Sequence, residues 1–190
     1  MEETKELTLP EQARDQAKNY FRQGMNCTEC VMQSFLDIHG SDLPPEVIAL
    51  ATVFGGGMGH TKNTCGAITG GVMALSAVVG RKHPLAKESM AERIAELNEI
   101  YDISGRMVHE MEEKFGTLIC KELSDPHGDF EGKARKKNCM QMIGDCAEIA
   151  MKYIMEAEGK KFIIGSLLDS YFLSNTWVKF LPSSLTDTVY

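Results

Sequence analysis

The chain has 190 residues with 20 basic and 27 acidic side chains, a formal net charge of −7. Its 43% hydrophobic and 25% charged residues exclude a disordered protein, and its acidic excess argues against a nucleic-acid partner. No uncharged apolar run reaches the ~18 residues of a membrane-spanning helix, and residues 1–6 lack the basic and apolar regions of a secretory signal, so we expect a cytoplasmic protein.

The apolar residues recur with helical spacing along most of the chain, which predicts an all-α fold. We expect a bundle of about five or six helices with one long central helix and a Gly-rich loop. The candidate helices, in chain order, cover residues 11–23, 27–39, 45–54, 65–79, 84–115 and 137–158. Residues 117–132 contain Pro126, Gly128 and Gly132 and are expected to be irregular.

Three of these segments suggest how the bundle is assembled. Residues 65–79 are rich in Gly and Ala, so another helix can approach their backbone closely, and this helix belongs in the centre. Residues 84–115 carry apolar side chains at steps of three and four, which is typical of a bundle seam. The tract at residues 55–59 has four glycines in five residues, which no regular element tolerates.

The composition changes at Gly159, so we predict a helical domain at residues 1–158 and a C-terminal extension at residues 159–190. The extension is apolar but interrupted by polar residues, Gly and Pro. Its alternatives are an extra helix on the bundle, a contact in a homodimer and an unstructured tail.

Six cysteines in a cytoplasmic chain indicate metal binding or thiol chemistry more than disulfide bonds. Cys27 and Cys30 form a C-x-x-C motif at a predicted helix start, and Cys65 stands at another. Asn138 could cap a helix beside Cys139, and Cys146 follows on the same helix face. Because a helix N-terminus stabilises thiolates, we predict a cluster of thiols with lowered pKa values.

The glycine tract lacks the residues of a phosphate-binding loop or a dinucleotide-binding fingerprint. We expect its glycines to let the backbone turn tightly and approach whatever Cys65 faces. Gly56, Gly57 and Gly66 are the cofactor-binding candidates. His60 is the one histidine near this region, although an exposed loop residue is its simpler interpretation, and Glu29 is either a local base or a solvated carboxylate.

Taken in order, several motifs resemble one known family. They are Gly24-x-Asn26-Cys27, Phe54-Gly55-Gly56-Gly57-Met58-Gly59, Cys65-Gly66-Ala67-Ile68-Thr69-Gly70, Phe115-Gly116-x-x-x-Cys120-x-Glu122-Leu123, and Cys139 ahead of Ala147-Glu148-Ile149. The chain resembles the C_GCAxxG_C_C family of redox-active, helical prokaryotic proteins. The resemblance spans residues 13–154 and implies that the signature cysteines are Cys27, Cys65, Cys120 and Cys139, whereas Cys30 and Cys146 depart from the pattern.

Three functions follow from these residues, in order of preference. The first is a thiol oxidoreductase with an unknown redox partner, in which Cys27 or Cys65 attacks and a neighbour such as Cys30, Cys120 or Cys139 resolves. The second is a metal protein in which the four signature cysteines bind zinc or an iron–sulfur cluster. The third is a helical interaction or dimerisation module with packed cysteines. The sequence leaves the disulfide pairing and the cofactor open.

Overall fold

The computed structural model describes the backbone of residues 6–174 and the side chains of residues 6–159. The chain forms two compact units, Met1–Met155 and Glu156–Tyr190. The cysteines all lie in the first unit, which is described below. Of the predicted C-terminal extension, the part beyond residue 174 lies outside the described residues, and the domain division at residues 158 and 159 stays a prediction.

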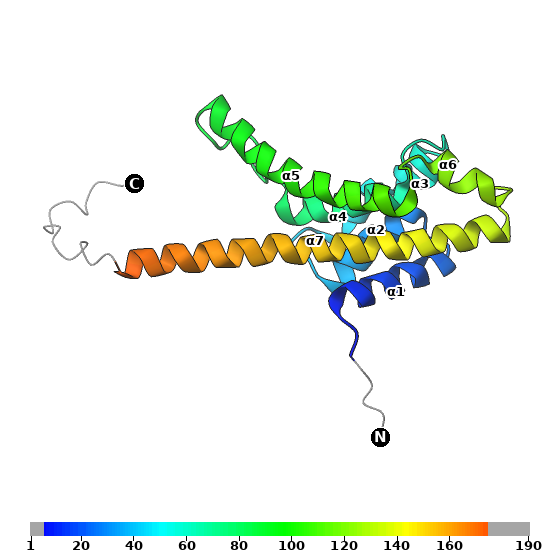
Figure 1. Cartoon of the computed structure of the whole chain (residues 1–190), viewed down its shortest axis with the longest axis horizontal. Coiled ribbons are helices and arrows are strands. Elements are labelled where there is room, and N and C mark those ends of the chain that lie inside the picture. The colour runs from blue at the N-terminus through cyan, green and yellow to red at the C-terminus, as the bar shows by residue number, and fades with distance from the viewer. Residues whose placement is uncertain (1–5, 175–190) are drawn as a thin grey trace, which may run out of the picture. The chain divides into compact units, whose positions relative to one another are not determined.

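The described part of the chain is all-α, as predicted, and its elements form a helical bundle (Figure 1). The α-helices are α1 (Leu9–Arg22), α2 (Cys27–Ile38), α3 (Gly55–Met58), α4 (Gly66–Val79), α5 (Met90–Phe115), α6 (Cys120–Ser124) and α7 (Lys133–Ser174). Two 3-10 helices join them, η1 (Pro45–Phe54) and η2 (Asp125–His127). Among the described helices, none is both long and apolar enough to cross a membrane.

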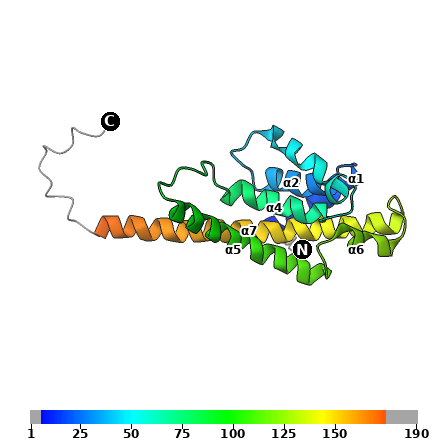
Figure 2. The same ribbon diagram turned by 90° about the horizontal axis from the view of Figure 1, so that it is seen from above.

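Helix α4 lies in the interior of the bundle because its small residues allow close approach. A Cβ atom at Gly70 would lie 2.9 Å from the carbonyl oxygen of Thr28 in α2, so the two backbones pack directly against each other. A Cβ at Gly71 would meet the Met111 methyl group of α5 at 3.0 Å. Figure 2 shows α4 running beside α2. The prediction that residues 65–79 form a thin, central helix is confirmed.

The chain between α2 and α4 differs from the prediction. Residues 45–54 form the 3-10 helix η1 rather than an α-helix. The glycine tract is helical at Gly55–Met58, although Gly56 and Gly57 adopt positive φ angles of 63° and 74°. Only glycine adopts such a conformation at little cost, so this turn depends on its composition.

Helix α5 is shorter and less central than predicted. It begins at Met90, where Ser89 caps it by accepting a hydrogen bond from the backbone N–H of Glu92, so residues 84–89 lie outside it. The predicted seam is wrong in the first half of the helix, where Met90, Ile94 and Tyr101 are exposed. The buried side chains, Ile103, Met107 and Met111, all lie in the second half of the helix, where Met111 approaches Gly71 of α4.

Two further corrections concern the region before the last helix. Residues 117–132 are not wholly irregular, because they contain α6 and η2. Helix α7 begins at Lys133 rather than near residue 137, and it extends past residue 158 to Ser174. Asn138 therefore does not cap a helix start; its side-chain amide donates to the carbonyl of Leu123 and joins α7 to α6.

Candidate functional site

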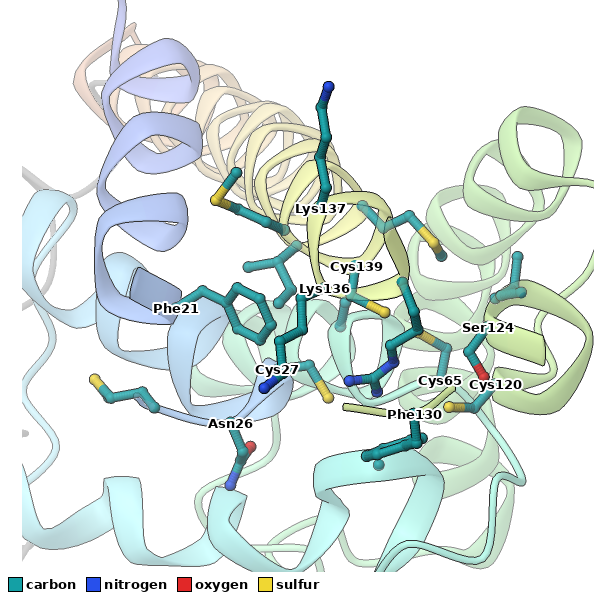
Figure 3. Close-up of a pocket in the computed structure, with 18 of the residues that line it drawn as sticks. Phe21, Asn26, Cys27, Cys65, Cys120, Ser124, Phe130, Lys136, Lys137 and Cys139 are labelled. Atoms are coloured by element: carbon teal, nitrogen blue, oxygen red, sulfur yellow. The ribbon is translucent and has the colours of Figure 1, made fainter. Parts of the chain in front are cut away.

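A cavity of about 630 Å³ opens in the first unit, and the four signature cysteines line it. Figure 3 shows the side chains of Cys27, Cys65, Cys120 and Cys139 around this one hollow, carried by four separate parts of the fold. Cys65 and Cys120 are buried, whereas Cys27 and Cys139 are half-buried. All six cysteines are free thiols in the structure.

Cys27 is the first residue of α2, and the local sequence fixes this helix start. The Asn26 side chain accepts hydrogen bonds from the backbone N–H groups of Thr28 and Glu29, at 2.9 and 3.1 Å. In return, the Glu29 carboxylate accepts from the backbone N–H of Asn26 at 3.0 Å. This reciprocal capping box satisfies the free N–H groups at the helix start. Glu29 thus has a structural role, and it also accepts a hydrogen bond from the Thr52 hydroxyl.

Cys65 and Cys120 are held close together by a short antiparallel pairing of two backbone segments. Thr64 and Ile119 form its central bridge. The backbone N–H of Cys65 donates to the carbonyl of Leu118 at 2.8 Å, and the N–H of Cys120 donates to the carbonyl of Asn63 at 2.7 Å. This pairing joins residues that are 55 positions apart in the sequence (120 − 65), so both thiols reach the same cavity wall.

Cys139 reaches the cavity from the second turn of α7. Its predicted position near a helix start is wrong, because α7 begins six residues earlier at Lys133. Cys30 and Cys146 are fully buried and do not line the cavity. The Cys30 thiol instead donates to the carbonyl of Met25 at 3.5 Å, which leaves the C-x-x-C motif with one thiol in the cavity and one in the core.

The candidate glycines make room for the cysteine side chains. A Cβ atom at Gly66 would lie 2.3 Å from the Cys27 Sγ atom, so the thiol packs directly against the backbone beside Cys65. A Cβ at Gly57 would lie 2.8 Å from the Cβ of Cys120 and 2.7 Å from the backbone nitrogen of Asn63. Gly56 itself lines the cavity. The predicted close approach near Cys65 is therefore present, and cysteine side chains occupy the space.

The prediction of thiols with lowered pKa values is wrong for five of the six cysteines. Burial and, after it, the charge of Cys27 raise the pKa of Cys65 to about 12, against the backbone N–H groups of Ala67 and Ile68, which lower it. Burial is also the main cause of the raised pKa of the remaining four, which are Cys30, Cys120, Cys139 and Cys146. Helix-start amides do stabilise the Cys65 thiolate, but dehydration outweighs them.

Sequence reasoning missed the basic side chains of the cavity. Arg22, Arg135, Lys136 and Lys137 line it together with one acidic residue, Glu131. The Lys-rich stretch before Asn138 was the available signal for a basic site, but the acidic net charge of the whole chain argued against anionic partners. His60 also lines the cavity and packs against the Phe130 ring, with 5.0 Å between the ring centroids.

The predicted metal ligands share the cavity but not a preformed coordination site. Within residues 6–159, no group of three or more His, Cys, Asp or Glu side chains is placed to hold one metal ion. Binding of zinc or an iron–sulfur cluster by Cys27, Cys65, Cys120 and Cys139 therefore stays a prediction.

One protein family matches the chain, over residues 25–153, and its description reads "Putative redox-active protein (C_GCAxxG_C_C)". The match covers all six cysteines and the glycine tract. No curated protein and no solved structure shows a significant match to this chain.

Proposed function

The chain belongs to the C_GCAxxG_C_C family, and from this premise we propose that it is a thiol–disulfide oxidoreductase that reacts through Cys27 and Cys65. The observation that carries the proposal is the gathering of the four signature cysteines around one cavity. Cysteines that serve only as apolar packing can lie anywhere in a core, as Cys30 and Cys146 do. Packing alone therefore gives no reason for four thiols from separate segments to line the same open space.

Cys27 is the attacking thiol in this proposal. It is half-buried, so a substrate in the cavity can reach it, and it stands at the N-terminus of a helix of 12 residues. Such a position directs the partial positive charge of the helix terminus toward the attacking sulfur. Cys139 is similarly exposed, but it lies in the second turn of α7, and the helix-terminus effect falls off within the first turn.

Cys65 is the resolving thiol, because the Cys27 Sγ atom packs against the backbone of the next residue, Gly66. The Cys27 thiolate attacks a sulfur of an external disulfide, R–S–S–R, forms a Cys27–S–S–R bond and releases one R–S⁻, which takes up a proton. Cys65 then loses its proton and attacks Cys27 Sγ, which forms the Cys27–Cys65 disulfide and releases the second R–S⁻. Two electrons thus pass from the protein dithiol to the external disulfide.

The order of these steps follows from electrostatics. Burial is the main cause of the raised pKa of Cys65, and the charge of Cys27 is the second. Formation of the mixed disulfide removes that charge, so the pKa of Cys65 falls at the stage when Cys65 must react. We also infer a cytoplasmic location, because that compartment keeps thiols such as these reduced.

The test is to equilibrate the protein in thiol–disulfide buffers between about −320 and −180 mV, the range of cellular thiol couples, and to map the disulfides by alkylation and mass spectrometry. We expect a reversible Cys27–Cys65 bond that both Cys27→Ser and Cys65→Ser abolish. Cys30→Ala and Cys146→Ala are the matched controls, because these cysteines lie outside the cavity. If no pair of signature cysteines changes state in this range, the proposal fails.

A further inference from the structure

Arg135 carries an unsatisfied donor at the edge of the cavity. Its side chain lines the cavity, the residue is only 8% exposed, and its buried Nε–H has no hydrogen-bond partner among the described residues. One face of its guanidinium is covered by the Phe130 ring, whose centroid lies 3.5 Å from Cζ. A buried hydrogen-bond donor without a partner is costly, so a ligand that accepts a hydrogen bond from Arg135 Nε would gain an interaction that the described residues do not provide.

The charges around the cavity have the opposite sign to the net charge of the chain. Figure 3 shows Lys137 extending away from the hollow, which leaves Arg22, Arg135 and Lys136 as the basic lining residues. Glu131 is the acidic lining residue, and its carboxylate pairs with the Lys136 ammonium group at 2.7 Å. The lining therefore has a net charge of +2 (3 − 1), in a chain of −7. A local excess of this kind concentrates anions.

The size and the walls of the cavity fit a small molecule. Its volume of about 630 Å³ lies within the usual range of small-molecule sites. Phe21 and Phe130 supply apolar wall, and Figure 3 shows the Lys136 side chain beside the Cys27 thiol in the same hollow. A planar guanidinium presents paired donors that match a carboxylate.

From these observations we propose that the cavity binds a low-molecular-weight disulfide that carries carboxylate groups, with Arg135 as the carboxylate anchor. This substrate class rests on the thiol–disulfide function proposed above. The carboxylate pairs with Arg135, and the ligand's S–S bond reaches Cys27. The exchange is the one already written: two protein thiols form one disulfide, and the anionic disulfide leaves as two molecules of thiol.

The experiment compares three disulfides that differ mainly in charge. They are 3,3′-dithiodipropionate (anionic), 2-hydroxyethyl disulfide (neutral) and cystamine (cationic). The rate of protein disulfide formation with each is divided by the rate of the same disulfide with 2-mercaptoethanol, which removes differences in intrinsic reactivity. We expect the normalised rate at low salt to be highest for the anion, by about tenfold or more over the neutral compound, as one hydrogen bond to a charged group provides.

Arg135→Gln should remove most of this preference while leaving the protein reactive toward the neutral disulfide. The ratio of the two rates is the readout, because Arg135 also lowers the pKa values of Cys120 and Cys139 and its loss can change all rates together. Lys87→Gln is the matched control, since it removes one positive charge from an exposed residue outside the cavity. Suberate, in which methylenes replace the two sulfurs, should slow the reaction of the anionic disulfide, and less so in the Arg135→Gln variant.

The outcomes separate the two proposals. If none of the three disulfides produces a protein disulfide, the redox function itself fails. If all three react at equal normalised rates, or if Arg135→Gln keeps the full anion preference, only the substrate class is overturned. Should Arg135→Gln not fold by circular dichroism, Arg135→Lys decides instead, because it keeps the charge but not the planar fork: a partly reduced preference supports the proposal and an unchanged one overturns it.

Discussion

Replacing Gly66 by alanine tests whether the family's glycine after Cys65 is there to accommodate the Cys27 thiol. The added Cβ would lie 2.3 Å from Cys27 Sγ, 2.7 Å from the Thr28 hydroxyl oxygen and 3.0 Å from the carbonyl oxygen of Phe54. All three distances are shorter than normal contacts. The two side chains can rotate away, but the Phe54 carbonyl belongs to the backbone. The thiol of Cys27 therefore cannot keep its position in the variant.

The expected cost is a loss of about 1–2 kcal/mol in the free energy of unfolding. Overpacking a well-filled site costs about 1–3 kcal/mol, and the gain from replacing a helical glycine by alanine, about 0.5–1 kcal/mol, offsets part of it. Such a loss lowers the melting temperature of a chain of this size by ~2–8 °C. We also expect slower formation of the Cys27–Cys65 disulfide, because Cys27 Sγ has moved.

The measurement is urea unfolding of the reduced protein followed by circular dichroism, together with the rate of disulfide formation. Gly105→Ala is the matched control: Gly105 lies inside α5, and a Cβ there would meet nothing within 4 Å. The same substitution should thus stabilise the protein at residue 105, by about 0.5–1 kcal/mol. If Gly66→Ala is as stable as Gly105→Ala and forms the disulfide at the normal rate, the steric reasoning is refuted.

Three further predictions concern the residues around the cysteines. Asn26→Ala removes the cap of α2, so it should cost about 1 kcal/mol of stability and slow alkylation of Cys27. Asn26→Ser keeps a capping oxygen and should do neither. Equal losses for the two variants in urea unfolding and alkylation assays would contradict this prediction. Thr28→Val should stabilise the protein slightly or leave it unchanged, because the buried Thr28 hydroxyl has no partner in the described structure; a loss above about 1 kcal/mol in the same unfolding assay would show that the hydroxyl is satisfied. Stability of the reduced protein should fall as the pH rises from about 9 toward about 12. The folded Cys65 thiol stays protonated up to about pH 12, while the unfolded chain ionises from an ordinary value of 9.0. Unfolding midpoints that do not change between pH 8 and pH 10.5 would contradict this.

The sequence was sufficient to predict the features that depend on local pattern. Helical spacing and capping residues such as Asn26 located α2, and the small residues of α4 indicated its central place. The resemblance to the family selected four cysteines, and the structure places those four, without Cys30 and Cys146, around the cavity. These signals share a cause, because each lies within one helix or in an ordered set of motifs; the chemical role of the four cysteines stays a prediction.

The features that the sequence did not predict depend on contacts between distant segments. The pairing of Cys65 with Leu118 and of Cys120 with Asn63 joins loops that carry no strand pattern. The start of α7 has no strong capping residue before Lys133, so the sequence favours Asn138 as the cap. It therefore predicts Cys139 at the helix start, but Cys139 lies in the second turn of α7. Dehydration of the thiols was also invisible, since burial in a cavity wall is a property of the assembled fold.

The raised pKa values of the buried cysteines limit which thiol can start a thiol–disulfide exchange. A buried cysteine that stays protonated, such as Cys65 with a pKa of about 12, cannot start thiol–disulfide exchange with a solvent oxidant, because the thiolate is the nucleophile. In the proposed mechanism, reaction therefore begins at Cys27, which is half-buried, and loss of the Cys27 charge in a mixed disulfide removes one of the causes that keep Cys65 protonated. If Cys65 is the resolving thiol as proposed, the same burial protects it from oxidation by solvent species and makes its reaction depend on a mixed disulfide already formed at Cys27.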